Sequence, residues 1–112
     1  MQLEVKKYLL DALDCAKAIE AFVEGKTFYD LRNDNLLRSA VYFQFTIIGE
    51  ALTQMRGYDE ATFDRITDSP RIVGFRNQII HGYQGIRDTV TWQIIQKNLP
   101  ILRIELEQLL AE

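Results

Sequence analysis

The stretch that decides the fold is Asp34–Gly57, which reads DNLLRSAVYFQFTIIGEALTQMRG. Its apolar residues recur at three- and four-residue steps, the spacing that gathers side chains on the faces of an α-helix. Asn33 or Asp34 can cap the start of this helix, and Gly57 follows its last apolar turn. The apolar positions cover more than one narrow stripe, so we expect burial on two sides. They are Leu36, Leu37, Ala40, Val41, Ile47, Ile48, Ala51, Leu52 and Met55.

A first helix precedes this stretch and a short helix follows it. The first helix has helical apolar spacing and meets a natural stop at Gly25. We interpret Thr27–Arg32 as a connection. Asp59 can cap a short helix that ends near Ile66. The apolar positions of the first helix are Val5, Leu9, Leu10, Leu13, Ala16, Ile19, Ala21 and Phe22.

The C-terminal half predicts two more helices. Ser69 at the N-cap and Pro70 at the first helical position form a strong start signal, and Gly82 and Gly85 end that helix. The last helix opens at Asp88 or Thr89 and carries eight apolar positions up to Leu110, with a bend near Asn98 because Pro100 interrupts it. Those positions are Val90, Ile94, Ile95, Leu99, Leu102, Leu106, Leu109 and Leu110.

Together these patterns predict an all-α fold, an antiparallel four-helix bundle with a short additional helix. The 112 residues and 47% hydrophobic content suit a single domain over residues 1–112. The longest charge-free stretch of the central helix, Ser39–Gly49, is too short to cross a bilayer, and no leader pattern follows Met1. We therefore expect a soluble, cytoplasmic protein that does not associate with membranes.

The cysteine count and the charge narrow the function further. A lone Cys15 can form neither an internal disulfide nor a cysteine zinc site, so it is expected at the core or its boundary. The net charge of −3 argues against a generic nucleic-acid coat. Within Arg65–Arg87, however, four arginines face a single acid, Asp68. Positive charge is therefore concentrated in one segment.

That segment contains Arg76–Tyr83, which reads RNQIIHGY and includes the only histidine. An arginine can hold a phosphate through two hydrogen bonds, and an imidazole can exchange a proton at physiological pH. A tyrosine can donate a hydrogen bond or accept a covalent group. Arg76, His81 and Tyr83 therefore form a candidate set for phosphate chemistry.

Helical geometry separates these residues. Arg76 falls inside an apolar arc, so its guanidinium should meet a carboxylate, a carbonyl cluster or a phosphate at an interface. Glu50 is the expected counter-charge, since it lies on a polar line of the central helix with Ser39, Thr46 and Thr53. The apolar arc is formed by Ile72, Val73, Phe75, Ile79 and Ile80.

Asn77 and His81 are four residues apart and share a different side of the same helix, next to Gly74. A glycine there would let another backbone or a ligand come close. Purely structural roles stay open for the motif: an arginine at a core edge can reach solvent, a histidine can cap a helix C-terminus, and Tyr83 can anchor a turn.

At these residues the chain resembles the HEPN superfamily, and more closely its HepT-like branch with the motif Arg-x4-His-x-Tyr. Ile48–Ala51 (IGEA) and Gly74–Asn77 (GFRN) resemble segments of the same branch. The segment Val90–Ile95, followed by Leu99-Pro100, resembles its final helix. The likeness runs from about Ser39 to Leu110, and three linked segments are more specific than one Arg…His spacing.

The resemblance implies a metal-independent endoribonuclease without a cofactor, acting on RNA as a homodimer whose two motifs line one cleft. His81 would be the general base or acid, Arg76 would stabilise the phosphorane charge, and Asn77 would orient the phosphate or the imidazole, with Glu50 in support. The resemblance also implies a toxin whose cognate antitoxin, a minimal nucleotidyltransferase of the MntA type, adenylylates Tyr83.

Two other interpretations fit the same sequence. A non-catalytic HEPN adaptor would bind a nucleotidyltransferase partner and use Arg76 and His81 in its dimer core, an interpretation that the acidic balance favours. A purely structural helical dimer would need Arg76 for stability alone.

Overall fold

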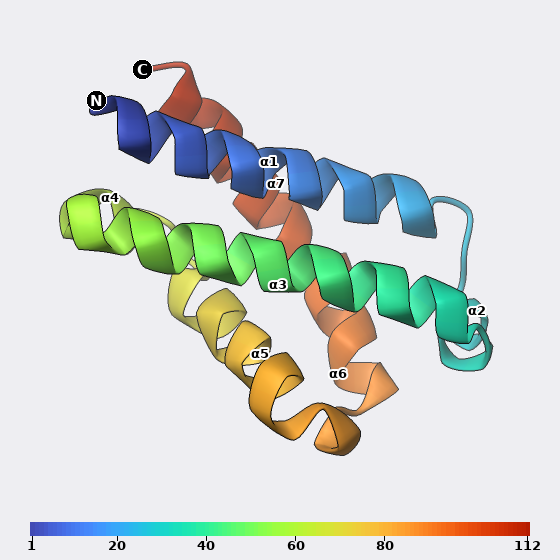
Figure 1. Cartoon of the computed structure of the whole chain (residues 1–112). Coiled ribbons are helices and arrows are strands. Elements are labelled where there is room, and N and C mark those ends of the chain that lie inside the picture. The colour runs from blue at the N-terminus through green and yellow to red at the C-terminus, as the bar shows by residue number, and fades with distance from the viewer.

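The chain forms helices and no strands, as the computed structural model of residues 1–112 shows (Figure 1). The all-α prediction is confirmed. Three short helices, α2, α4 and α6, rather than one, accompany the longer ones, and two irregular turns interrupt the series. The elements are α1 (Leu3–Val23), α2 (Phe28–Asn33), α3 (Asn35–Tyr58), α4 (Glu60–Asp64), α5 (Ser69–Gly82), the 3₁₀ turn η1 (Tyr83–Gly85), α6 (Asp88–Gln93), the π-helical turn η2 (Ile94–Asn98) and α7 (Leu99–Leu110).

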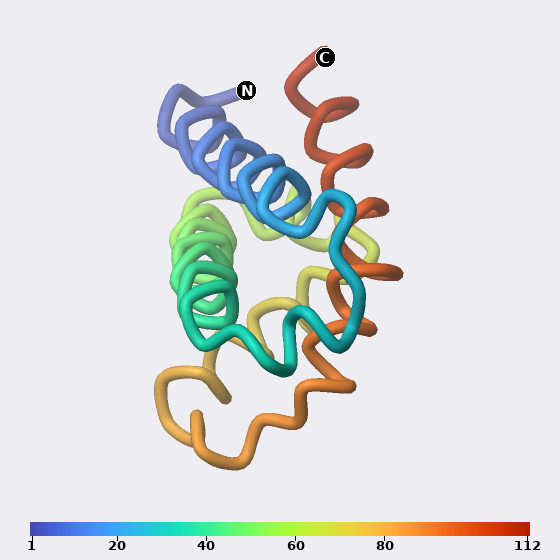
Figure 2. Tube along the Cα trace, turned by 90° about the vertical axis from the view of Figure 1, so that its right-hand side faces the viewer, coloured from blue at the N-terminus to red at the C-terminus, as the bar shows by residue number.

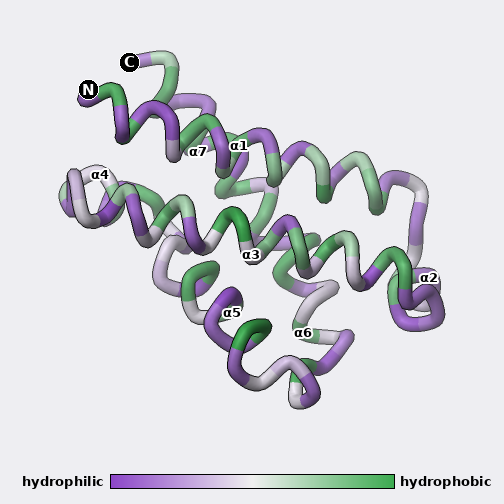
Figure 3. The backbone as a smooth tube through the Cα atoms, in the orientation of Figure 1, coloured by the Kyte–Doolittle hydropathy of each residue, from purple (hydrophilic) through white to green (hydrophobic).

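Helix α3 lies between α1 and α5, which confirms its predicted burial on two sides (Figure 1). Asp34 caps it, accepting a 3.1 Å hydrogen bond from the backbone N–H of Leu37. Hydrophobic and hydrophilic residues alternate along the helices (Figure 3), as expected for amphipathic helices that bury one face and expose another. Leu36 and Phe43 nevertheless remain 80% and 63% exposed, so α3 has an apolar face that the chain itself does not cover.

Helix α1 packs against α3 and α7 and ends as predicted. Gly25 adopts a φ of 73°, a backbone conformation that glycine tolerates best. Leu10, Ala21 and Phe22, three apolar positions of the predicted pattern, are exposed, since α3 and α7 are the main elements that cover this helix. Cys15 is half-buried at the edge of the core, as expected.

The prediction of a connection over Thr27–Arg32 is wrong, because this segment contains helix α2. Thr27 and Asp30 form a capping box: the Thr27 hydroxyl accepts from the Asp30 N–H at 3.2 Å, and the Asp30 carboxylate accepts from the Thr27 N–H at 2.8 Å. Leu31 is fully buried below it. These local bonds form a helix too short to show apolar periodicity.

The predicted cap at Asp59 is confirmed for α4, which ends at Asp64 rather than near Ile66. Ser69 is not the N-cap of α5 but its first residue, preceded by Asp68. Its buried hydroxyl donates instead to the carbonyls of Phe63, at 2.9 Å, and Ile66, at 3.1 Å. Ser69 thus fastens the start of α5 to the end of α4.

Replacing Ser69 by alanine should therefore destabilise the fold. The variant loses these buried hydrogen bonds, and we expect a loss of about 1 kcal/mol, which lowers Tm by roughly 4–8 °C in a domain of this size. Thermal unfolding followed by circular dichroism measures the shift. Ser39→Ala is the matched control, because Ser39 is exposed; equal melting curves for the two variants would contradict this role.

The last helix opens at Asp88 as predicted and is interrupted before Pro100. The interruption is the π-helical turn η2, in which the Leu99 N–H reaches back five residues to the Ile94 carbonyl. The predicted bend near Asn98 thus takes the form of a π turn. Figure 2 shows both chain termini at one end of the molecule and the loop between α5 and α6 at the other.

None of the helices combines the length and apolar composition needed to cross a membrane.

Candidate functional site

The site is organised where α5 crosses α3 at Gly49. A Cβ at this position would lie against the Cβ of Arg76 and 2.5 Å from its Cγ. The absent side chain of Gly49 therefore lets the stem of Arg76 rest directly on α3. Gly74, for which the sequence predicted close approach, has no atom within 4 Å of a Cβ built on it. Within the chain, Gly49 and not Gly74 makes the close contact. That a second molecule approaches Gly74 closely stays a prediction.

The Arg76 guanidinium is held on two sides. Its Nη2 lies 2.6 Å from Glu50 Oε2, and its Nη1 donates to Asn77 Oδ1 at 3.0 Å. The side chains of Arg76 and Glu50 are 22% and 47% exposed. The structure thus places Arg76 against the expected carboxylate. Its Nε is shielded and has no hydrogen-bond partner.

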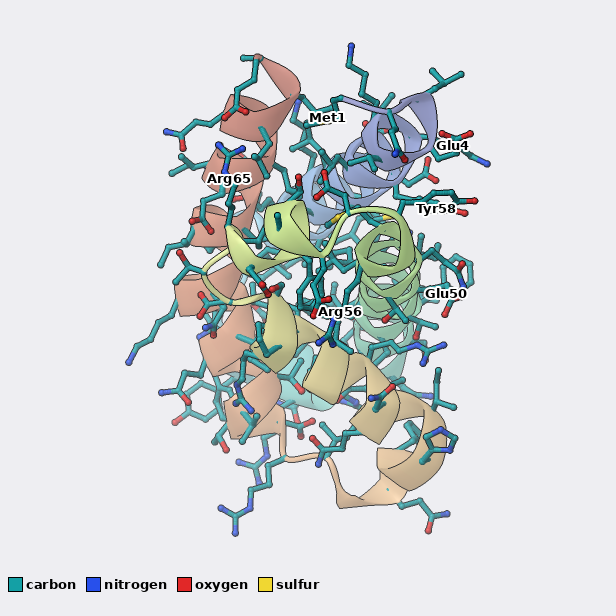
Figure 4. All side chains as sticks on the ribbon, turned by 90° about the vertical axis from the view of Figure 1, so that its left-hand side faces the viewer. Met1, Glu4, Glu50, Arg56, Tyr58 and Arg65 are labelled. Atoms are coloured by element: carbon teal, nitrogen blue, oxygen red, sulfur yellow. The ribbon has the colours of Figure 1, made fainter.

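Arg76 and Glu50 also form part of the wall of a surface cavity of about 450 Å³ between α1, α3 and α5. Figure 4 shows Glu50 on the outer side of α3. The guanidinium is therefore next to open space that a phosphate oxygen could enter. The remaining wall residues are Tyr8, Asp11, Thr46, Ile47 and Ala51.

Thr46 and Thr53 do not contribute polar groups to this space. Their hydroxyls donate to the carbonyls of Tyr42, at 2.9 Å, and Gly49, at 2.8 Å, within their own helix. Of the predicted polar line on α3, only Glu50 reaches α5.

His81 lies in the last turn of α5, five residues and about 7.5 Å along the axis from Arg76. Its side chain is exposed and forms no hydrogen bond or ion pair with the rest of the chain. Asn77 is exposed on the same side, whereas Arg76 points toward α3. A single chain therefore brings Arg76, Asn77 and Glu50 together but leaves His81 apart from Arg76.

The apolar arc of α5 is narrower than predicted. Ile72 and Phe75 are buried and Val73 and Ile79 are half-buried, but Ile80 is 45% exposed. Only α3 covers the length of α5, so the helix buries one narrow face. The exposed side carries Arg71, Gly74, Gln78 and His81 at helical spacing, and α5 contains no acidic residue.

Tyr83 begins η1 and is 59% exposed. Its ring meets the ring of Tyr42 edge-on, with centroids 6.3 Å apart and planes at 88°. The Tyr42 hydroxyl lies 3.2 Å from the Thr91 hydroxyl, and burial raises the pKa of Tyr42 above its ordinary value. Tyr83 thus presents an accessible phenol whose ring packs against the half-buried, neutral phenol of Tyr42.

A family model described as Ribonuclease HepT-like matches residues 12–109. The chain belongs to this family. A protein of Methanocaldococcus jannaschii named as a candidate RNase is 30% identical over 104 residues, which cover 93% of this chain and 94% of that protein. A candidate ribonuclease HepT of Thermococcus cleftensis is 28% identical, with the same coverage. A third relative, a candidate RNase of Caldanaerobacter subterraneus, is 29% identical over 88% of this chain and 87% of its own length. No solved structure matches.

The fold of this HepT-like chain also assigns places that the sequence left unassigned. In the sequence Gly49 stands out only as part of the segment Ile48–Ala51, yet it sets the distance between α3 and α5 at Arg76. No sequence pattern marks Tyr42, whereas the spacing of seven and ten residues from Arg71 to Gln78 and His81 places Arg71 on the same side of α5. No three His, Cys, Asp or Glu side chains converge in a way that could hold a metal ion.

Proposed function

We propose that this HepT-like protein is a metal-independent endoribonuclease that uses His81 and Arg76. The observation that carries the proposal is the placement of Arg76, fixed by Glu50 and Asn77 at the edge of an open cavity, on the same acid-free helix that exposes His81. Cleavage of RNA by the purified protein, compared with His81→Ala and Arg76→Ala, tests it.

In the proposed reaction one imidazole takes the proton of a ribose 2′-hydroxyl. The 2′-oxygen then forms a bond to phosphorus while the bond to the 5′-oxygen breaks, and the leaving oxygen receives a proton from a second acid. Arg76 stabilises the charge that develops on the phosphorane oxygens. The products are a 2′,3′-cyclic phosphate and a 5′-hydroxyl, and no step needs a metal ion.

The active form in this proposal is a homodimer. Each chain has one histidine, so a second copy supplies the second proton-transfer group, and Arg76 and His81 point in different directions on α5. The exposed apolar residues Leu36 and Phe43 on α3 and Ile80 on α5 are the surface expected to be covered by that copy.

Phe43→Glu should therefore disrupt the dimer and RNA cleavage together. Burying a charge at a packed interface weakens association at least about tenfold. Light scattering gives the mass in solution, and gel analysis of RNA gives the activity. Leu3→Glu, on an exposed leucine of α1, is the matched control; a dimeric Phe43→Glu variant would place the interface elsewhere.

The proposed regulation is adenylylation of Tyr83 by a minimal nucleotidyltransferase antitoxin, with this protein as the toxin of the pair. The exposed phenol is open to such an enzyme, and an added AMP would bring bulk and negative charge two residues from His81. The modified protein should be unable to admit RNA.

Incubation with the cognate nucleotidyltransferase and ATP should add AMP to wild-type protein and stop RNA cleavage. Intact-mass and peptide mass spectrometry locate the group. Tyr83→Phe should stay unmodified and active under the same conditions, and Tyr29→Phe, at another exposed tyrosine, should behave as wild type. Modification at a different tyrosine would refute this regulation.

A non-catalytic adaptor is the second candidate, favoured by the net charge of −3 and by an Arg76 already paired with Glu50. It predicts binding of a nucleotidyltransferase with no difference in RNA cleavage between wild type and His81→Ala.

A further inference from the structure

A second cavity, of about 240 Å³, lies where η1 comes beside the first turns of α3. Tyr83 and Gln84 line it from one side, and Ser39 and Tyr42 from the other. The cavity on the Arg76 side does not share any of these residues. Its position matters because Tyr83 follows His81 by two residues, which keeps the two backbones within about 7 Å.

The aromatic walls of this cavity suit a flat ring. Tyr42 is fixed by its hydroxyl contact with Thr91 and by edge-on packing against Phe75, with ring centroids 6.3 Å apart. Tyr83 stands against it and keeps much of its surface open. A nucleobase stacking on such a tyrosine is a common way to hold single-stranded RNA.

The polar walls favour a neutral base over a phosphate. Arg38, the cation at this cavity, already donates to the carbonyls of Leu31, at 3.0 Å, and Arg32. The Asp88 carboxylate, which also lines the cavity, would repel an anion. The Gln84 amide, the Ser39 hydroxyl and the Asn35 side-chain NH₂ group can hydrogen-bond to a base edge, whereas Asn35 Oδ1 already accepts from Arg38 at 3.3 Å.

We propose that this cavity is a nucleobase subsite, which holds one unpaired base of the RNA strand beside the phosphate at which His81 and Arg76 promote cleavage. The inference rests on the proposed ribonuclease function. It adds that the active site selects RNA with an unpaired base next to the cleaved phosphate. Tyr83 then stacks on the base, and the polar groups on α3 contact its edge.

Binding of labelled single-stranded RNA to the full-length His81→Ala protein tests the subsite without cleavage. Oligonucleotides with one abasic position, moved along the strand, are compared by fluorescence anisotropy. One position should weaken binding roughly 5- to 100-fold, the effect of losing one stacked base. Tyr83→Ala should weaken binding of intact RNA by a similar factor and become insensitive to that abasic position, while Tyr83→Phe retains the parent behaviour.

Ser39→Trp is the second variant, since it fills the cavity from an exposed helix position, and Tyr29→Ala is the control at a remote exposed tyrosine. Ser39→Trp should weaken binding of intact RNA by about the same factor as Tyr83→Ala and should likewise be insensitive to that abasic position. Equal sensitivity to every abasic position in the parent and in both cavity variants, or no binding at all, would overturn the subsite.

The cleavage assay separates this result from the proposed function. If wild type cleaves and His81→Ala does not, but the abasic effect is independent of Tyr83, only the subsite is wrong. If His81→Ala cleaves as wild type does while the abasic effect depends on Tyr83, the subsite stands and the catalytic role of His81 is wrong.

Discussion

His81→Ala is expected to lower the rate of RNA cleavage by about 10²–10⁴-fold, the usual contribution of a general acid or base. Its thermal unfolding should match that of wild type, because the His81 side chain is exposed and makes no hydrogen bond within the chain. A loss of activity without a loss of stability is the signature of a chemical role. Gln108→Ala, at an exposed position of α7, should leave both measurements unchanged.

Arg76→Ala should give the same loss of cleavage with a small change in stability. The Arg76–Glu50 pair is partly exposed, and pairs of this kind contribute about 0–1 kcal/mol. A purely structural Arg76 would show the opposite result: a large drop in Tm, and activity that falls only in proportion to the unfolded fraction.

Gly49→Ala is expected to have the largest effect on the α3–α5 packing. A methyl group there overlaps the Cβ and Cγ of Arg76, atoms too close to the backbone to move alone, so α5 must shift away from α3. We expect a loss of about 1–3 kcal/mol, as for overpacked cores, and at least a tenfold loss of cleavage because Arg76 leaves its place.

Gly57→Ala is the matched control in the same helix. A Cβ at Gly57 meets no atom within 4 Å, so the gain in helix propensity should stabilise the protein by up to about 1 kcal/mol. Chemical denaturation measures both variants. A Gly49→Ala variant as stable and active as Gly57→Ala would contradict the close packing of Arg76 on α3.

The sequence predicted the long helices well because their signals are local. Apolar spacing marked α1 and α3, Asp34 and Asp59 marked helix starts, and Pro100 marked the irregular turn. Helix α2 was missed because its stability comes from the capping box of Thr27 and Asp30 rather than from apolar spacing.

The site was only partly predictable for a physical reason. Spacing along α5 gives the direction of each side chain around that helix, and it separated Arg76, which points toward α3, from the exposed His81; Asn77, which it also separated, nevertheless accepts a hydrogen bond from Arg76. It does not say where a second helix crosses, so the close approach at Gly49 was not predicted, and Ile80 was wrongly assigned to the core. The pairing of Arg76 with Glu50 was foreseen because a half-buried guanidinium needs a carboxylate.

The most direct measurement is the product analysis of one RNA oligonucleotide and its analogue with a single 2′-deoxynucleotide at the cleavage position. If His81 activates the 2′-hydroxyl, wild-type protein in EDTA yields a 2′,3′-cyclic phosphate and a 5′-hydroxyl from the RNA. It leaves the analogue intact at that position, and His81→Ala cleaves neither. Cleavage of the 2′-deoxy analogue at the same position, or equal cleavage by wild type and His81→Ala, would contradict the mechanism.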